Sequence, residues 1–361
     1  MSSLPIQTKD NSEWRLTEKE LCHLDTLKKL TEPTIADLCR KEHPNLLIFP
    51  QDLDVYGDKI GDAHIFEVKG ETIVTGNIMG FIGCGDTKVS ISSRFAQGKD
   101  DYFLHYMLRK VFAVNLFDLQ FNSDEESIFD FLIYLFPAFL KRAMQQGMYR
   151  EYQTRKYNDA NVKGRMDIFR PISHPYYGEY RPLQQLCLQI LLQEEMKYGR
   201  DDDEIYGVLF DGAWLWEEYL NTFLADIGFE HPRNKEGIGH KSLFTDGSVW
   251  CYPDFLSPKM VLDAKYKGYD DWSKVQTKDL YQVISYMHVL NRKKGGYIVP
   301  VDWASSKLPS KTLKGQGGIM SIYGMDVCFK AESFKDYYSS MALSEQEIIN
   351  NLEAYRGKEA I

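Results

Sequence analysis

At 361 residues, the chain is long enough for two or three domains, and its 43% hydrophobic and 14% aromatic content supports several buried cores and excludes a disordered protein. Its six cysteines are scattered without a CxxC pair, which argues against a structural zinc site and against a redox motif. The formal net charge of −9 argues against a protein that grips nucleic acid over its whole surface, but it leaves room for a local basic patch or for a partner that holds the DNA.

The chain shows no membrane or export signal. Its N-terminal residues lack the apolar core of a signal peptide. The most hydrophobic stretch, 128–140, is too short to span a bilayer and contains Asp130 and Pro137. Together with the scattered cysteines, which suit a reducing compartment, these features predict a cytoplasmic chain without a membrane segment.

The first part of the chain predicts a β-rich domain followed by helices. Residues 1–43 have the pattern of short helices. Short β-branched segments separated by Gly, Asp and Pro run from 45 to 94, which predicts a small antiparallel β-domain. Residues 101–146 and 182–196 are helical in pattern, and a basic irregular stretch occupies 150–170. An acidic break at 200–204 favours a domain boundary there.

From residue 205 onward, helices and strands alternate. A helix in 210–228 is closed by Gly228, and strands at 248–255 and 260–267 are joined by a tight turn. A helix at 278–290, a strand at 296–301, a β-pair at 318–330 and a C-terminal helix opened by a Ser344–Glu347 capping box follow. This alternation predicts an α/β domain with a mixed sheet.

The whole chain is therefore predicted to be a multidomain α+β protein. It comprises an N-terminal β-rich domain (1–115), a helical linking region (116–204) and a C-terminal α/β domain (205–361).

The stretch 252–267 carries the strongest chemical signal. Side chains alternate across a strand, so Asp263 and Lys265 point to one face while Ala264 points to the other. Asp254 lies on the preceding strand of the same predicted hairpin, and the short turn brings it close to Asp263. The sequence thus predicts two carboxylates and an ammonium group at one place.

Two carboxylates held together repel each other unless a cation lies between them. Mg²⁺ accepts one or two protein carboxylates, keeps several waters and takes its other ligands from phosphate oxygens. A bound cation of this kind activates water and neutralises charge on a phosphodiester, and Lys265 is suited to orient or deprotonate that water.

A D-x-K sequence by itself is usually a solvated, salt-bridged strand face. Here Val261 and Leu262 run directly into Asp263, so the charged pair emerges at the end of a buried strand, where function tends to lie. Gln282 and Tyr286 have the i, i+4 spacing that places both on one face of the following helix, which can lie against that strand.

These residues resemble a known nuclease motif. Asp254, followed after eight residues by Asp263-Ala264-Lys265, resembles the PD-(D/E)xK motif, and Gln282-x-x-x-Tyr286 is similar to the helical motif that follows it in many such enzymes. The segment LDAKYK and the later DLYQVISYMHVL resemble the McrC family in particular, with weaker likeness at 101–112 and 161–172.

The resemblance implies a PD-(D/E)xK endonuclease domain at 205–361 that hydrolyses phosphodiester bonds in double-stranded DNA. It implies that Asp254, Asp263 and the backbone carbonyl of Ala264 hold Mg²⁺, while Lys265 positions the attacking water.

Other residues are given less specific roles. The resemblance implies that Gln282 and Tyr286 support the site or touch the DNA strand. The resemblance places Glu217 where this nuclease class often carries an extra acidic residue that approaches the metal; alternatively, Glu217 lies on the solvent-exposed side of an amphipathic helix. Lys163 and Arg165 suit contacts to the DNA backbone, and equally suit contacts to a partner subunit or to acidic residues of this chain.

In the McrC family the nuclease works with a separate AAA+ GTPase hexamer, and the resemblance implies that residues 1–115 dock on it. The sequence has no GxxxxGK[ST] loop of its own, in agreement with this division of labour. Two other classes stay open: a stand-alone repair-type nuclease, and a non-catalytic activator of the GTPase. The intact set of Asp254, Asp263 and Lys265 argues against the second.

Overall fold

A computed structural model describes residues 5–40, 46–50, 62–97, 101–112, 205–233, 238–302, 310–315 and 317–353. The chain divides into two compact units. The first comprises Met1–Arg94 and Leu108–Asp211, and the second comprises Phe95–Met107 and Gly212–Ile361. Each unit is therefore assembled from two separate stretches of the sequence.

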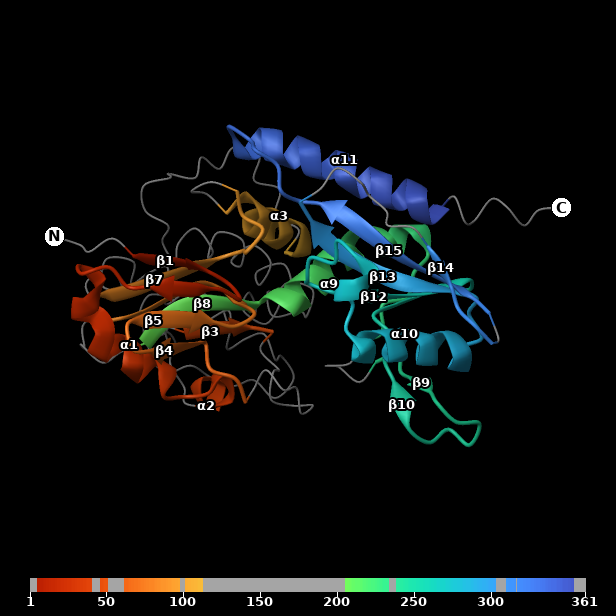
Figure 1. The fold of residues 1–361 in the computed structure, drawn as a ribbon, viewed down its shortest axis with the longest axis horizontal. Helices are drawn as coiled ribbons and strands as arrows, with labels where there is room; N and C mark the ends of the chain where they lie inside the picture. Colours follow the sequence, from red (N-terminus) through yellow and green to blue (C-terminus); the bar gives the residue numbers. More distant parts are fainter. Residues whose placement is uncertain are drawn as a thin grey trace, which may run out of the picture. The chain divides into compact units, whose positions relative to one another are not determined.

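Two sheets form the described part of the first unit (Figure 1). The larger has the strand order β1-β7-β6-β8-β3, and the smaller has the order β2-β5-β4. The larger sheet contains β1 (Ile6–Lys9), β3 (Leu46–Phe49), β6 (Ile78–Cys84), β7 (Thr87–Ser92) and β8 (Ile205–Asp211). The smaller contains β2 (Glu13–Arg15), β4 (Phe66–Lys69) and β5 (Thr72–Thr75). The short helices are η1 (Glu20–His23), α1 (Leu24–Thr31) and α2 (Ile35–Arg40).

The prediction of an antiparallel β-domain over 45–94 is confirmed for two strand pairs, since β4 pairs with β5 and β6 pairs with β7 in antiparallel fashion, but it fails at the two edges of the larger sheet. β1 pairs with β7, and β3 pairs with β8, in parallel. The short helices expected in 1–43 are present from Glu20 to Arg40, but the strands β1 and β2 precede them. In β1, buried Ile6 and Thr8 alternate with exposed Gln7 and Lys9, a period of two that is too brief to recognise over four residues.

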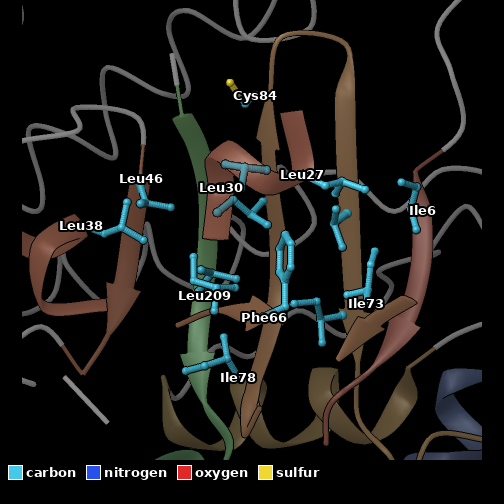
Figure 2. Packing of buried hydrophobic residues seen from close by; sticks show 14 of the residues in the cluster. Ile6, Leu27, Leu30, Leu38, Leu46, Phe66, Ile73, Ile78, Cys84 and Leu209 are labelled. Carbon is cyan, nitrogen blue, oxygen red and sulfur yellow. The ribbon is translucent and has the colours of Figure 1, made fainter. Parts of the chain in front are cut away.

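The core of the first unit lies where the strands and α1 meet (Figure 2). Leu27 and Leu30 of α1 are fully buried, as are Phe66 of β4 and Ile73 of β5. Burying an aliphatic or aromatic side chain of this size contributes roughly 1.5–3 kcal/mol. This packing explains why short strands with weak individual patterns form a stable unit.

The second unit contains a mixed sheet of order β11-β12-β13-β15-β14. β12, β13 and β15 are parallel to one another, whereas β11 and β14 pair antiparallel at the edges. The strands are β11 (Phe255–Leu256), β12 (Met260–Ala264), β13 (Lys294–Val301), β14 (Lys311–Thr312) and β15 (Ile319–Asp326). A two-stranded sheet of β9 (Lys241–Ser242) and β10 (Trp250–Cys251) precedes them. The expected mixed sheet is thus present.

Helices cover both faces of this sheet (Figure 1). α10 (Thr277–Val289) lies on one face, where Val283 and Met287 pack over Gly295. α9 (Gly212–Leu224) and α11 (Phe334–Glu353) lie on the other, where Trp216 Nε1 donates to the carbonyl of Ile298 at 3.4 Å. α3 (Tyr102–Val111) begins in this unit. None of the described helices has the length and apolarity needed to cross a membrane.

Of two helix ends predicted from the sequence, one is confirmed and the other is wrong. After α9, the turn η2 (Ala225–Ile227) ends at Gly228, whose φ of 86° is the left-handed conformation expected of a closing glycine. The predicted capping box is wrong, because Ser344 lies inside α11 and its Oγ donates to the carbonyl of Asp326. Ser333, whose Oγ accepts from the backbone N–H of Asp336, caps the true start of α11.

The α+β character predicted from the sequence is confirmed. The unit boundaries fall at residues other than 115 and 204, because β8 pairs with β6 and β3 in the first unit and Phe95–Met107 packs into the second. The predicted helical linking region 116–204 lies outside the described residues.

Candidate active site

The candidate site is centred on Asp263, at the end of the buried strand β12. Asp263 is fully buried, and β12 continues past it because the backbone N–H of Lys265 donates to the carbonyl of Ile298 at 3.0 Å. Val261, Asp263 and Lys265 alternate onto the face covered by α10. The apolar strand therefore delivers one carboxylate and one ammonium group to the same side of the sheet.

Asp254 is placed beside Asp263 by the pairing of β11 with β12. Phe255 is opposite Leu262 in that register, so the next pair outward is Asp254 and Asp263. The side chain of Asp254 accepts from the backbone N–H of Ala264 through Oδ2 at 2.7 Å. Its carbonyl accepts from His231 Nδ1, also at 2.7 Å. Both ends of the aspartate are thereby held.

The ammonium group of Lys265 lies between the strand and α10. Its Nζ is 2.7 Å from Asp263 Oδ2 and donates to Gln282 Oε1 at 3.4 Å. Gln282 Nε2 donates to Tyr286 OH at 3.1 Å, and that hydroxyl donates to the carbonyl of Tyr252 at 3.4 Å. The structure thus brings together all five residues for which the sequence suggested catalytic roles.

Burial shapes the electrostatics of the two aspartates. It raises the pKa of Asp254 well above its usual value, and the charges of Glu217 and Asp263 raise that pKa further. Burial also raises the pKa of Asp263, although the ammonium of Lys265 opposes that shift. For Lys265 burial acts to lower the pKa, but Asp263 and Asp254 outweigh it, so the net pKa is raised and the side chain is charged.

The arrangement fits a divalent cation. Asp263 Oδ1 is buried and has no hydrogen-bond partner among the described residues, so it is an unused ligand atom. The repulsion between Asp254 and Asp263 is the kind that a cation removes. No group of three or more His, Cys, Asp or Glu side chains suited to a metal is found within the described ranges. A pair of carboxylates matches Mg²⁺, which keeps most of its waters, better than zinc.

Glu217 and Glu218 differ in their relation to the site. The charge of Glu217, on α9, reaches Asp254 and raises its pKa. Glu218 Oε1 instead lies 3.6 Å from Nε2 of His231, the residue that holds the Asp254 carbonyl. Glu217 therefore influences the site through its charge, whereas Glu218 interacts with His231, which in turn binds the Asp254 carbonyl. Lys163 and Arg165 lie outside the described residues.

Sequence reasoning missed four residues that border the site, namely His231, described above, and Asp279 with its partners Tyr269 and Lys267. Asp279, in the first turn of α10, is buried, and its Oδ2 accepts from Tyr269 OH at 2.5 Å and from Lys267 Nζ at 3.3 Å. Burial acts to raise the pKa of Asp279, but the hydrogen bond from Tyr269 and the nearby lysines outweigh it and lower that pKa. Spacing shows only that Asp279, three residues before Gln282, shares its helix face, and it does not show that Asp279 lies beside Lys265.

Comparisons with known proteins identify a family and a shared fold. The family model described as McrBC 5-methylcytosine restriction system component matches residues 73–177 and 169–300. A chain in the refined half-complex from the tetradecameric assembly of Thermococcus gammatolerans McrB AAA+ hexamers with bound McrC is 15% identical, with a TM-score of 0.51, over 96% of this chain and 100% of that one. A search of curated proteins gave no significant match.

A chain in the cryo-EM structure of the Thermococcus gammatolerans McrBC complex is also 15% identical. The match covers 63% of this chain and 89% of that one, and its TM-score of 0.33 is too low to support an argument. At 15% identity, the first structural match establishes a shared fold and nothing more.

Proposed function

The chain belongs to the McrBC 5-methylcytosine restriction system component family, as its resemblance to McrC indicated, and from this premise we propose that it is the Mg²⁺-dependent DNA endonuclease subunit of such a system. The observation that carries the proposal is the convergence of Asp254, Asp263 and Lys265 in one buried place, with Lys265 Nζ 2.7 Å from Asp263 Oδ2. The reaction is hydrolysis of a phosphodiester bond in double-stranded DNA.

In this proposal, the two aspartates bind the metal and Lys265 acts on the water and the phosphate. Asp254, Asp263 and the backbone carbonyl of Ala264 would hold Mg²⁺, which when bound neutralises phosphate charge and makes water a better nucleophile. Lys265 presents an ammonium group that donates hydrogen bonds to the attacking water and offsets the negative charge that develops on the phosphate. Its side chain is 18% exposed, so the ammonium is within reach of a substrate.

α10 keeps this lysine in place. Gln282 accepts a hydrogen bond from Lys265 Nζ, and Tyr286 holds the other end of the Gln282 amide. Burial raises the pKa of Tyr286 to about 12, so its hydroxyl keeps its proton at neutral pH and can donate to the Tyr252 carbonyl. Hence Gln282 and Tyr286 orient Lys265.

We further propose that the working partner is an McrB-like AAA+ GTPase hexamer. The shared fold with a chain from an assembly of McrB hexamers with bound McrC supports this, as does the absence of a nucleotide-binding loop in the sequence. A partner that holds the DNA also accounts for the net charge of −9, which is unfavourable for binding DNA alone.

The deciding experiment measures cleavage of methylated and unmethylated plasmid DNA in Mg²⁺, with and without the GTPase and GTP. Wild type is compared with Lys265→Ala and with Lys274→Ala, which removes an exposed lysine paired with Asp270. Cleavage that needs Mg²⁺, GTP, the partner and Lys265, but not Lys274, supports the proposal.

The other outcomes identify the alternatives. Cleavage by this chain alone would indicate a stand-alone nuclease. Stimulated GTP hydrolysis without cleavage of either DNA would indicate a non-catalytic activator. Full activity of Lys265→Ala would overturn the site assignment.

A further inference from the structure

Lys265 has a second carboxylate within reach. Asp279 Oδ1 lies 4.0 Å from Lys265 Nζ, on the α10 side, while Asp263 Oδ2 lies 2.7 Å away on the strand side. Asp279 is only 4% exposed, so its charge is poorly screened by water. The ammonium therefore lies between two buried carboxylates, and it contacts that of Asp263, which is proposed to bind the cation.

Asp279 is held rigidly in this position. Its Oδ2 accepts from Tyr269 OH at 2.5 Å and from Lys267 Nζ at 3.3 Å, which leaves Oδ1 directed toward Lys265. Tyr269 is itself buried against the core beneath α10. A fixed carboxylate with one oxygen engaged and the other near an ammonium is well placed to receive that ammonium.

The contact between Lys265 and Asp263 opposes cation binding, because the ammonium on Oδ2 and a cation on Oδ1 would share one carboxylate and repel each other. We propose that Asp279 is a positioning residue that receives the Lys265 ammonium when a divalent cation takes Asp263. This inference rests on the proposed function. The four-carbon stem of a lysine allows the short movement, and Gln282 Oε1 remains within reach of Nζ. Asp279 thereby keeps the Lys265 ammonium inside the site when the cation binds Asp263.

The test is binding of Mn²⁺ alone to the full-length, DNA-free protein, followed by electron paramagnetic resonance of free and bound Mn²⁺. A double-mutant cycle compares wild type, Asp279→Asn, Lys265→Met and the double variant. Asp279→Asn is expected to weaken Mn²⁺ binding by about fivefold or more when Lys265 is present, because the ammonium then has no alternative to Asp263.

In the Lys265→Met background, the same Asp279→Asn change is expected to weaken Mn²⁺ binding by less than about twofold, because no ammonium competes. A general loss of negative charge, or a loosened α10, would weaken binding equally in both backgrounds. The cycle therefore separates positioning from a structural role. Asp270→Asn, which removes an exposed carboxylate that pairs with Lys274, is the control and is expected to leave Mn²⁺ binding unchanged.

Equal weakening in both backgrounds overturns the role of Asp279 while leaving the nuclease proposal intact. A wild-type protein that does not bind Mn²⁺ saturably overturns the cation site, and this inference with it. If Lys265→Met fails to fold, Lys265→Gln gives the same neutral background. Asp279→Glu, which keeps the charge, is expected to recover part of the affinity that Asp279→Asn loses.

Discussion

Replacing Lys265 with methionine is expected to destabilise the second unit when no divalent cation is present. The substitution keeps most of the aliphatic stem and removes the ammonium that lies 2.7 Å from Asp263 Oδ2. Asp254 and Asp263 then remain as two adjacent buried carboxylates. The variant therefore measures how much of their repulsion the ammonium offsets.

The size of the effect follows from burial. The Asp263 side chain is 1% exposed and that of Lys265 is 18% exposed. Removing one partner of a buried ion pair typically costs about 3–5 kcal/mol, because the remaining charge keeps its desolvation cost. Protonation of an aspartate would relieve part of this, so we expect a loss of about 3 kcal/mol, at the lower end of that range.

Lys274 provides a matched control. Its Nζ is also 2.7 Å from a carboxylate oxygen, that of Asp270, but the two side chains are 59% and 49% exposed. Exposed pairs contribute at most about 1 kcal/mol, so Lys274→Met is expected to change the free energy of unfolding by less than that. The two ion pairs that these substitutions remove have the same N–O distance and differ in their exposure to solvent.

The assay is urea unfolding in EDTA, followed by tryptophan fluorescence. This signal reports chiefly on the second unit, since five of the six tryptophans fall within it. Adding Mg²⁺ should recover about 2.7 kcal/mol at a hundredfold excess over its dissociation constant. A Lys265→Met protein that matches wild type in EDTA, or that gains nothing from Mg²⁺, would refute the reasoning from convergent carboxylates.

Three further predictions concern single residues. Asp263→Asn is expected to abolish DNA cleavage while circular dichroism and stimulation of the partner GTPase stay as in wild type; retained cleavage would show that the site is elsewhere. Arg94→Met, which leaves buried Asp10 without its guanidinium, should cost the first unit about 3–5 kcal/mol in urea unfolding, against less than about 1 kcal/mol for exposed Arg15→Met. Gly296→Ala, whose Cβ would lie 2.0 Å from a carbonyl oxygen of β15, should lower stability by about 3 kcal/mol or more; an unchanged melting temperature would contradict this β13–β15 packing.

The centre of the candidate site was accessible from sequence because its geometry is local. Asp263 and Lys265 are two residues apart on one strand, and Asp254 lies across a short turn from them. Strand alternation and hairpin register are enough to bring such residues together. Gln282 and Tyr286 were accessible for a similar reason, because helical spacing places them on one face.

Asp279 was not accessible in this way. Its position beside Lys265 depends on how α10 lies across β12, which is a matter of packing between Val283, Met287 and the sheet rather than of spacing. The pairing of β8 with β6 could not be predicted from the sequence either, because it joins two distant segments, Ile205–Asp211 and Ile78–Cys84. Long-range strand pairing leaves no local pattern, and this explains why the predicted boundary at 205 separates strands that share a sheet.

The composition of the site bears on the choice between an enzyme and a scaffold. Two buried carboxylates with raised pKa values are a destabilising arrangement, and a buried ion pair is often matched or exceeded in stability by apolar residues of similar size. A unit needed only to activate a GTPase gains nothing from Asp254, Asp263 and Lys265 together. The proposed hydrolysis does need them, because the same repulsion, and an Asp263 Oδ1 that has no hydrogen-bond partner among the described residues, would favour binding of a divalent cation. The instability is therefore an argument for hydrolysis at this site.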